Sequence, residues 1–228
     1  MKTLGVLGGM GPAATLDFLA KLQAATPAGR DQDHLRVLVD INPQVPDRND
    51  PGNEPGPVLA AMAVGLRDAG AQVLAIACNT AHVYAEEVRV ASGLPLIDMI
   101  DIACQTARRG GANRVGVLAT GLALGLYGDR LTGMGLEPLN LSKAKQEWFM
   151  SLLYRIKAGD LGDEVQDEMT AVAESLVQAG AEAVIAGCTE VPLVLAADDL
   201  EVPLIDAGQV LAERCVAVCR SEGPGARG

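Results

Sequence analysis

The sequence predicts an α/β protein of two similar halves, each built from a parallel sheet with helices packed on it. Three observations carry this prediction: the composition, the alternation of strand and helix patterns, and an internal repeat. Hydrophobic residues make up 49% of the 228 residues, whereas aromatic residues make up only 3%. A core of Ala, Val, Leu and Ile favours buried parallel strands covered by helices. The length suits two domains of roughly 100 residues each, or one large domain.

Strand and helix patterns alternate along the first half of the chain. Short apolar runs predict strands at Leu4–Gly8, Leu35–Ile41, Val73–Ala77 and Leu96–Asp98. Helical patterns between them predict helices at Pro12–Ala25, Pro57–Ala69 and Thr80–Ala91, and a further helix that runs through Arg109. Pro12 suits the first turn of its helix, and Gly70 suits the end of the next one. Alternation of this kind predicts parallel sheets.

The second half restarts the same order. Strands are expected at Arg114–Ala119, Ala183–Ala186 and Pro203–Ile205. Helices are expected around Gln146–Ala158, Glu164–Ala179 and Gln209–Arg220.

The two halves also share sequence. Gly5-Val6-Leu7 recurs as Gly116-Val117-Leu118, at an offset of 111 residues. Ile76-Ala77-Cys78 is matched by Ala186-Gly187-Cys188 at an offset of 110, and an Ala-Gly-Ala triplet precedes both. Pro95-Leu96-Ile97-Asp98 recurs as Pro203-Leu204-Ile205-Asp206, at an offset of 108. Three matches in the same order indicate that the chain contains two related units.

We therefore expect two pseudo-symmetric, flavodoxin-like domains. One would comprise residues 1–101 and 208–228 and carry Cys78, and the other would comprise residues 102–207 and carry Cys188. Ligands of open α/β sheets bind outside the carboxyl ends of the strands. If the halves face each other there, the active site lies in the cleft between them.

The two equivalent cysteines each follow a buried strand and precede a helical pattern. A single cysteine in such a place is usually a small core residue. Two equivalent ones, Cys78 beside Asn79 and Thr80 and Cys188 beside Thr189, favour chemistry instead. A helix N-terminus lowers the pKa of a thiol, and its free N–H groups can hold a carboxylate.

Two opposed thiols suit the inversion of a carbon centre by proton transfer. One base takes the proton from one face of the carbon, and a second acid delivers a proton to the other face. Fixed donors must stabilise the carbanion that develops between these two steps.

Two cations at matching positions of the repeat suggest a substrate with two carboxylates. Arg48 lies in a proline-rich loop and Lys157 ends a helix, and they are 109 residues apart, within the repeat. Both could equally be solvated surface charges. Glu190 is a candidate supporting carboxylate for Cys188, or else a helix cap. His82 could set the protonation state of Cys78, but a histidine bonded to the backbone is the simpler interpretation.

The overall charge and the cysteine usage exclude several classes of protein. A net charge of −11 argues against nucleic acid and against anionic membrane surfaces as partners. The N-terminus does not resemble a signal peptide, and no apolar stretch reaches the roughly 20 residues of a membrane span. Five cysteines without close metal-ligand pairs indicate a reduced, cytoplasmic protein.

A glycine-rich loop offers a competing interpretation. Gly9-x-Gly11-x-x-Ala14 lies between a strand and a helix, and Asp40 ends the next strand, as in a nicotinamide-dependent oxidoreductase. Pro12 lies where helix N–H groups would meet a pyrophosphate, and the second half carries no dinucleotide motif. The loop could equally place a helix N-terminus over a small carboxylate. A non-catalytic amino-acid sensor is a further alternative. Loss of either cysteine would leave the binding function of such a protein largely intact.

Taken together, six motifs resemble the aspartate/glutamate racemase family, in particular its aspartate racemase branch. They span nearly the whole chain and are Gly5–Pro12, Asn42–Arg48, Ala77–His82, Ile156–Gly159, Ala186–Glu190 and Val202–Asp206. The resemblance implies two α/β domains, a homodimer, and interconversion of L- and D-aspartate, or glutamate, without pyridoxal phosphate, metal or another cofactor.

The resemblance also implies roles for individual residues. Cys78 and Cys188 would be the two acid/base groups, and Arg48 and Lys157 match basic residues associated with substrate binding and dicarboxylate preference. The further residues expected to bind the small dicarboxylic amino acid are Met10, Gln44, Asn79, Thr80, Thr120, Thr189 and Glu190.

One segment departs from the family pattern. Aspartate racemases usually carry a Thr-Gly-Thr stretch after the first strand of the second half. Here Thr120–Tyr127 is shorter and lacks the second threonine. The departure concerns substrate identity more than reaction type, so amide, hydantoin or malonate-type substrates stay open. A single-cysteine decarboxylase is disfavoured because both cysteines are present.

Overall fold

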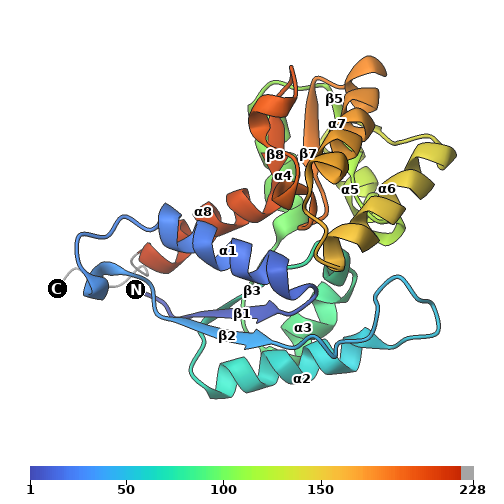
Figure 1. Cartoon of the computed structure of the whole chain (residues 1–228). Helices are drawn as coiled ribbons and strands as arrows, with labels where there is room; N and C mark the ends of the chain where they lie inside the picture. Colours follow the sequence, from blue (N-terminus) through green and yellow to red (C-terminus); the bar gives the residue numbers. More distant parts are fainter. Residues whose placement is uncertain (222–228) are drawn as a thin grey trace. The chain divides into compact units, whose positions relative to one another are not determined.

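The computed structural model describes residues 1–221, and it contains two parallel four-stranded sheets with helices on both faces (Figure 1). The predicted α/β class with two similar domains is therefore confirmed. The strand orders are β2-β1-β3-β4 and β6-β5-β7-β8. The second order repeats the first, which gives the internal sequence repeat its structural meaning. No helix among residues 1–221 is long and apolar enough to cross a membrane.

The first sheet joins four strands from the N-terminal part of the chain. They are β1 (Leu4–Gly8), β2 (Val37–Ile41), β3 (Val73–Ile76) and β4 (Leu96–Ile97). Strand β1 is central, and every residue in it is buried. Its pairing aligns Val6 with Val39 on one side and with Ala75 on the other. Full burial explains why this strand reads as a continuous apolar run rather than as an alternating one.

Helices cover both faces of the first sheet. Helices α2 (Pro55–Asp68) and α3 (Ala85–Ser92) lie on one face, and α1 (Pro12–Ala25) and α8 (Ala207–Arg220) lie on the other (Figure 1). Close packing against α2 needs Gly5 in β1, since a Cβ there would lie 2.8 Å from the Cβ of Ala71 and 3.3 Å from that of Leu66. The equivalent Gly116 approaches Leu176 in the same manner.

The second sheet has the same construction. Its strands are β5 (Arg114–Leu118), β6 (Glu137–Leu139), β7 (Ala183–Ala186) and β8 (Leu204–Asp206). Helices α4 (Met99–Arg109) and α5 (Gly121–Gly133) pack together, and so do α6 (Lys143–Lys157) and α7 (Asp163–Gln178). The core between the sheet and the second helix pair includes Phe149, Leu152, Met169 and Val172, all of them fully buried.

Two elements of the second half were not predicted. Helix α5 contains four glycines, at 121, 125, 128 and 133, and glycine is a poor helix former, so its helical pattern is weak. Strand β6 is only three residues long and contains Pro138. Both are held by tertiary packing, because α5 contacts β5 and β6 in the folded chain.

The segments after the two cysteines also differ from expectation. Thr80–Tyr84 is a 3₁₀ helix, and the α-helix α3 begins only at Ala85. After Cys188, the chain forms a short 3₁₀ turn at Val191–Leu193 rather than the N-terminus of a long helix. Pro192 lies within this turn and has no N–H for continuing a helix.

The chain divides into two compact units. Among the described residues, the first comprises Met1–Ala77, Tyr84–Asp98 and residues 211–221, and the second comprises Cys78–Val83 and Met99–Val210. The segment that carries Cys78 thus belongs with the second unit, although β3, which leads into it, belongs to the first. The domain boundaries drawn from the sequence stay a prediction.

Candidate active site

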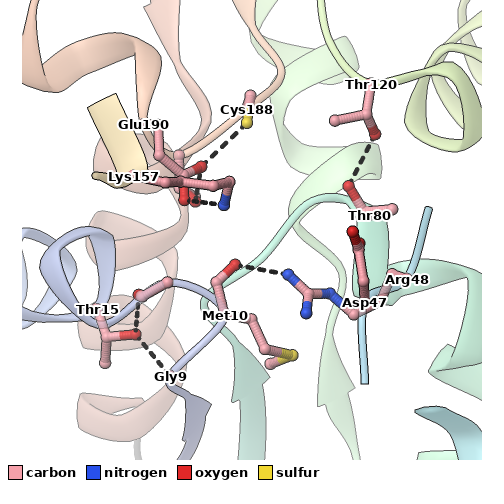
Figure 2. A network of polar contacts seen from close by, with 12 residues as sticks. Gly9, Met10, Thr15, Asp47, Arg48, Thr80, Thr120, Lys157, Cys188 and Glu190 are labelled. Atoms are coloured by element: carbon pink, nitrogen blue, oxygen red, sulfur yellow. Dashed lines mark hydrogen bonds and ion pairs between the residues drawn. The ribbon is translucent and has the colours of Figure 1, made fainter. Parts of the chain in front are cut away.

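A connected polar group surrounds Cys188, which follows β7. The Cys188 thiol donates to Glu190 Oε2 at 3.0 Å, and the hydroxyl of Thr189 donates weakly to the same oxygen at 3.4 Å. The other carboxylate oxygen, Oε1, pairs with the ammonium of Lys157 at 2.5 Å (Figure 2). The side chain of Glu190 is only 4% exposed, so this carboxylate is compensated by its partners rather than by water. Glu190 is thus in direct hydrogen-bonding contact with Cys188, and its role as a supporting carboxylate stays a prediction.

The surroundings of Cys188 favour the protonated thiol. Burial raises the pKa of Cys188 well above its ordinary value, the negative charge of Glu190 raises it further, and Lys157 opposes both effects. This corrects the expectation that a helix N-terminus would lower the pKa of the thiol. No long helix begins here, and a nearby carboxylate outweighs the dipole of a short 3₁₀ turn.

The charge of Lys157 interacts electrostatically with both cysteines. Burial lowers the pKa of Lys157, but Glu190, Cys188 and Cys78 raise it, and the net direction is upward. Lys157 therefore stays a cation at neutral pH. Lys157, Cys78 and Cys188 all belong to the second unit.

The segment after β3 is held by backbone hydrogen bonds. His82 Nε2 accepts from the backbone N–H of Met99 at 3.1 Å, so the ring proton lies on Nδ1, which bonds to the carbonyl of Cys78 at 2.8 Å. Both ring nitrogens are thus engaged by the backbone, as the simpler interpretation of His82 predicts. The histidine fixes the main chain at Cys78.

Two side-chain contacts join this segment to the second half of the sequence. The hydroxyls of Thr80 and Thr120 share a hydrogen bond of 2.8 Å (Figure 2), and the Tyr127 hydroxyl donates to Asn79 Oδ1 at 2.6 Å. All four side chains are buried. Within the described chain, the Asn79 amide nitrogen has no hydrogen-bond partner. A buried donor of this kind is suited to a ligand acceptor.

The remaining predicted site residues belong to the first unit. Arg48 donates from Nη2 to the carbonyl of Met10 at 3.0 Å (Figure 2). It also donates from Nη1 to the carbonyl of Pro46 at 3.3 Å. Its Nε is buried and has no partner among residues 1–221. The Met10 side chain is buried, whereas Gln44 is exposed and its backbone N–H bonds to Asn42. The location of the site in a cleft between the domains stays a prediction.

The glycine-rich loop is closed on itself. Gly9 has a φ of +93°, and a Cβ there would lie 2.4 Å from the backbone of Asn42, so only glycine fits. Its N–H donates to the hydroxyl of Thr15 at 2.8 Å, and that hydroxyl donates to the carbonyl of Gly11 (Figure 2). This N–H is therefore not free to hold a pyrophosphate, which weakens the dinucleotide interpretation.

Two polar residues near the site, the buried Tyr127 and the partly buried Gln146, were missed by sequence reasoning. Tyr127 contacts Asn79, and Gln146 donates to the carbonyl of Ala119 at 2.9 Å while its own oxygen is buried without a partner in the described chain. Tyr127 stands in a segment with few other polar side chains, which was the available signal. Gln146 gave no signal beyond its place near a helix start. As for metals, no group of three or more His, Cys, Asp or Glu within residues 1–221 could hold one.

Comparisons with known proteins agree with this architecture. A model of the Asp/Glu/hydantoin racemase family matches residues 7–215. The chain is 28% identical to the broad specificity amino-acid racemase RacX of Bacillus subtilis, over 94% of this chain and 96% of that one. The solved structure of Picrophilus torridus aspartate racemase superposes with a TM-score of 0.86 at 26% identity, covering 96% of this chain and 94% of that one. A glutamate racemase of Roseiflexus is 28% identical over 93% of this chain and 72% of its own length. The chain therefore belongs to the Asp/Glu/hydantoin racemase family.

Proposed function

We propose that this protein is a cofactor-independent amino-acid racemase that moves the α proton between Cys78 and Cys188. The observation that carries the proposal is the position of Lys157, which interacts electrostatically with both thiols and pairs with the carboxylate beside one of them. A cation that interacts with both cysteines stabilises whichever of them is the thiolate in a given half-reaction. Membership of the racemase family supplies the reaction class.

The proposed proton transfer needs one thiolate and one thiol at the start. In one direction, the Cys78 thiolate takes the proton from Cα, and the Cys188 thiol gives its proton to the opposite face of the carbanion. The cysteines end with exchanged protonation states, and the reverse reaction begins from there. The raised pKa of Cys188 and its hydrogen bond to Glu190 support Cys188 as the thiol of the resting protein. Each positioned acid or base contributes on the order of 10² to 10⁴ in rate.

We propose aspartate as the preferred substrate, followed by glutamate. The guanidinium of Arg48 is anchored by backbone carbonyls, while its buried Nε has no partner in the described chain. This donor is free to meet a side-chain carboxylate. The buried amide nitrogen of Asn79 is suited to the α-carboxylate in the same way.

A second candidate is a racemase of broad substrate range. Lys157 is already neutralised by Glu190, which leaves one cation fewer for a second carboxylate. The shortened Thr120–Tyr127 segment also favours a broad substrate range. A relative that matches 94% of the chain is named for broad specificity.

Deuterium exchange at Cα tests both proposals. Purified protein is incubated in D₂O with L- and D-aspartate, glutamate, asparagine and alanine, and exchange and inversion are followed by NMR and chiral chromatography. We expect inversion of aspartate to be fastest, and loss of at least 100-fold in both Cys78→Ala and Cys188→Ala. The control is Cys215→Ala, which removes an equally buried thiol from α8 and should leave the rates unchanged.

The outcomes separate the candidates. Wild-type rates in either cysteine variant of the pair would contradict the two-cysteine mechanism. Equal rates for alanine, asparagine and aspartate would favour the broad-range racemase, and so would an unchanged substrate ranking in Arg48→Ala.

A further inference from the structure

Tyr127 touches the segments that carry both cysteines. It lies on α5 and is fully buried. Its hydroxyl donates to Asn79 Oδ1 at 2.6 Å, one residue after Cys78. Its ring lies against Gly187, one residue before Cys188, where an added Cβ would be 2.7 Å from Tyr127 Cε2. A single side chain thus links the two segments.

The Tyr127 hydroxyl also sets the orientation of the Asn79 side-chain amide. An asparagine side chain offers an acceptor at one end and two donors at the other. Because the Tyr127 hydroxyl donates to the oxygen, the nitrogen must point elsewhere, and in the described chain it meets no acceptor. A buried amide donor left unpaired is costly, so this arrangement is consistent with a ligand acceptor that completes it.

The ring has a separate effect on the second segment. Gly187 is enclosed by the Tyr127 ring and by Ala119, whose Cβ would be 3.0 Å from a Cβ on Gly187. The backbone that leads into Cys188 therefore lies directly on the aromatic ring. The ring restricts where the Cys188 backbone can move.

We propose that Tyr127 is a positioning residue for the racemase reaction. Its hydroxyl orients Asn79 so that Nδ2 binds the substrate carboxylate, and its ring fixes the segment of Cys188. The proposal rests on the proposed function and names a residue outside the predicted site. Tyr127 needs no contact with substrate, since it acts through Asn79 and Gly187.

The kinetic test is a double-mutant cycle of Tyr127→Phe and Asn79→Ala. Phenylalanine keeps the ring on Gly187 and removes only the hydroxyl. We expect Tyr127→Phe to lower kcat/KM by about 10- to 100-fold, mainly through KM, because a hydrogen bond to a charged carboxylate is lost or misdirected. In the Asn79→Ala background the same change should have little further effect, since its target is gone. Tyr154→Phe, at an exposed tyrosine of α6, is the matched control and should keep wild-type kinetics.

A spectroscopic arm is independent of turnover. The side-chain amide of Asn79 is assigned in a ¹⁵N–¹H spectrum by its disappearance in Asn79→Ala. We expect Tyr127→Phe to shift this resonance and Tyr154→Phe to leave it in place. Circular dichroism checks that all variants are folded.

These readouts distinguish the two proposals. An unshifted Asn79 resonance in Tyr127→Phe, wild-type kcat/KM, or fully additive effects in the cycle would overturn the role of Tyr127. A shifted resonance in a protein that racemises no amino acid would overturn the proposed function and leave the orientation of Asn79 by Tyr127 in place.

Discussion

The segments that follow β3 and β7 carry cysteines at equivalent positions, but their surroundings differ. Two residues after Cys188 stands Glu190, which accepts from the thiol and pairs with Lys157. Two residues after Cys78 stands Thr80, whose hydroxyl is bonded to Thr120. The duplicated fold thus places the two thiols alike, whereas a carboxylate stands two residues after Cys188 and a hydroxyl stands at the equivalent place after Cys78.

Pseudo-symmetry of the fold therefore does not imply that the two thiols share one protonation state. A carboxylate beside a buried thiol disfavours its thiolate, and a hydroxyl carries no such charge. Cys188 is therefore expected to start the reaction as the protonated thiol. The following predictions test this comparison, from the largest effect to the smallest.

Removing the cation that pairs with Glu190 should have the largest effect. Lys157→Met leaves Glu190 buried beside Cys188 without its ion-pair partner. Breaking a buried ion pair costs about 3–5 kcal/mol, and about 2–4 kcal/mol is expected here because Lys157 is one third exposed. Urea unfolding measures the loss. The double variant Lys157→Met/Glu190→Gln should regain most of it, and equal losses in the single and double variants would contradict the pairing.

Neutralising the carboxylate should make the two segments more alike. In Glu190→Gln, the charge that raises the pKa of Cys188 is gone, so more thiolate forms at a given pH. For each unit by which its pKa falls, the thiolate fraction of Cys188 near pH 8 should rise about 10-fold. Its alkylation by iodoacetamide should become only about 3-fold faster, because a thiolate of lower pKa is a weaker nucleophile. Peptide mass spectrometry follows each cysteine separately, with Cys78 as the internal reference. An unchanged or slower rate at Cys188 would mean that Glu190 does not control its proton.

The segment after β3 should respond with a smaller loss of stability. Thr80→Val leaves the Thr120 hydroxyl buried without its partner, which costs about 1–3 kcal/mol. Replacing both residues by valine removes the unpaired group and should be less destabilising than either single change. Chemical denaturation of all three variants completes the cycle, and strict additivity would show that the two hydroxyls are not coupled.

The smallest effect concerns stability at alkaline pH. The pKa of Cys188 is raised in the folded protein, so the folded state keeps a proton that the unfolded chain releases above its ordinary thiol pKa. Stability from this group is complete below that pKa and declines as the pH rises, by about 1 kcal/mol between pH 8 and 9.5. Lys157, whose pKa is also raised, acts in the same direction at still higher pH. Unfolding free energies of Cys188→Ala should fall less steeply than those of the wild type, and parallel curves would exclude the contribution of Cys188.

The sequence by itself determined the fold class, the duplication, and the positions of both cysteines just beyond equivalent strands. Buried parallel strands read as short apolar runs, and the repeat aligned Cys78 with Cys188 without any structural information. It also singled out Glu190, because this residue stands two positions after Cys188. These features depend on neighbouring or regularly spaced residues, so the order of residues is enough to predict them.

The tertiary structure alone decided the features that depend on distant partners. Helix α5 is rich in glycine and is stabilised by its contacts with β5 and β6, so local propensity could not reveal it. Thr80 meets Thr120, and Asn79 meets Tyr127, across 40 and 48 residues of sequence. The sequence analysis predicted a lowered pKa for Cys188, whereas the pKa is raised, because a sequence motif does not show whether a side chain is buried. Once the fold removes that thiol from water and sets Glu190 against it, desolvation and the carboxylate outweigh any local backbone dipole.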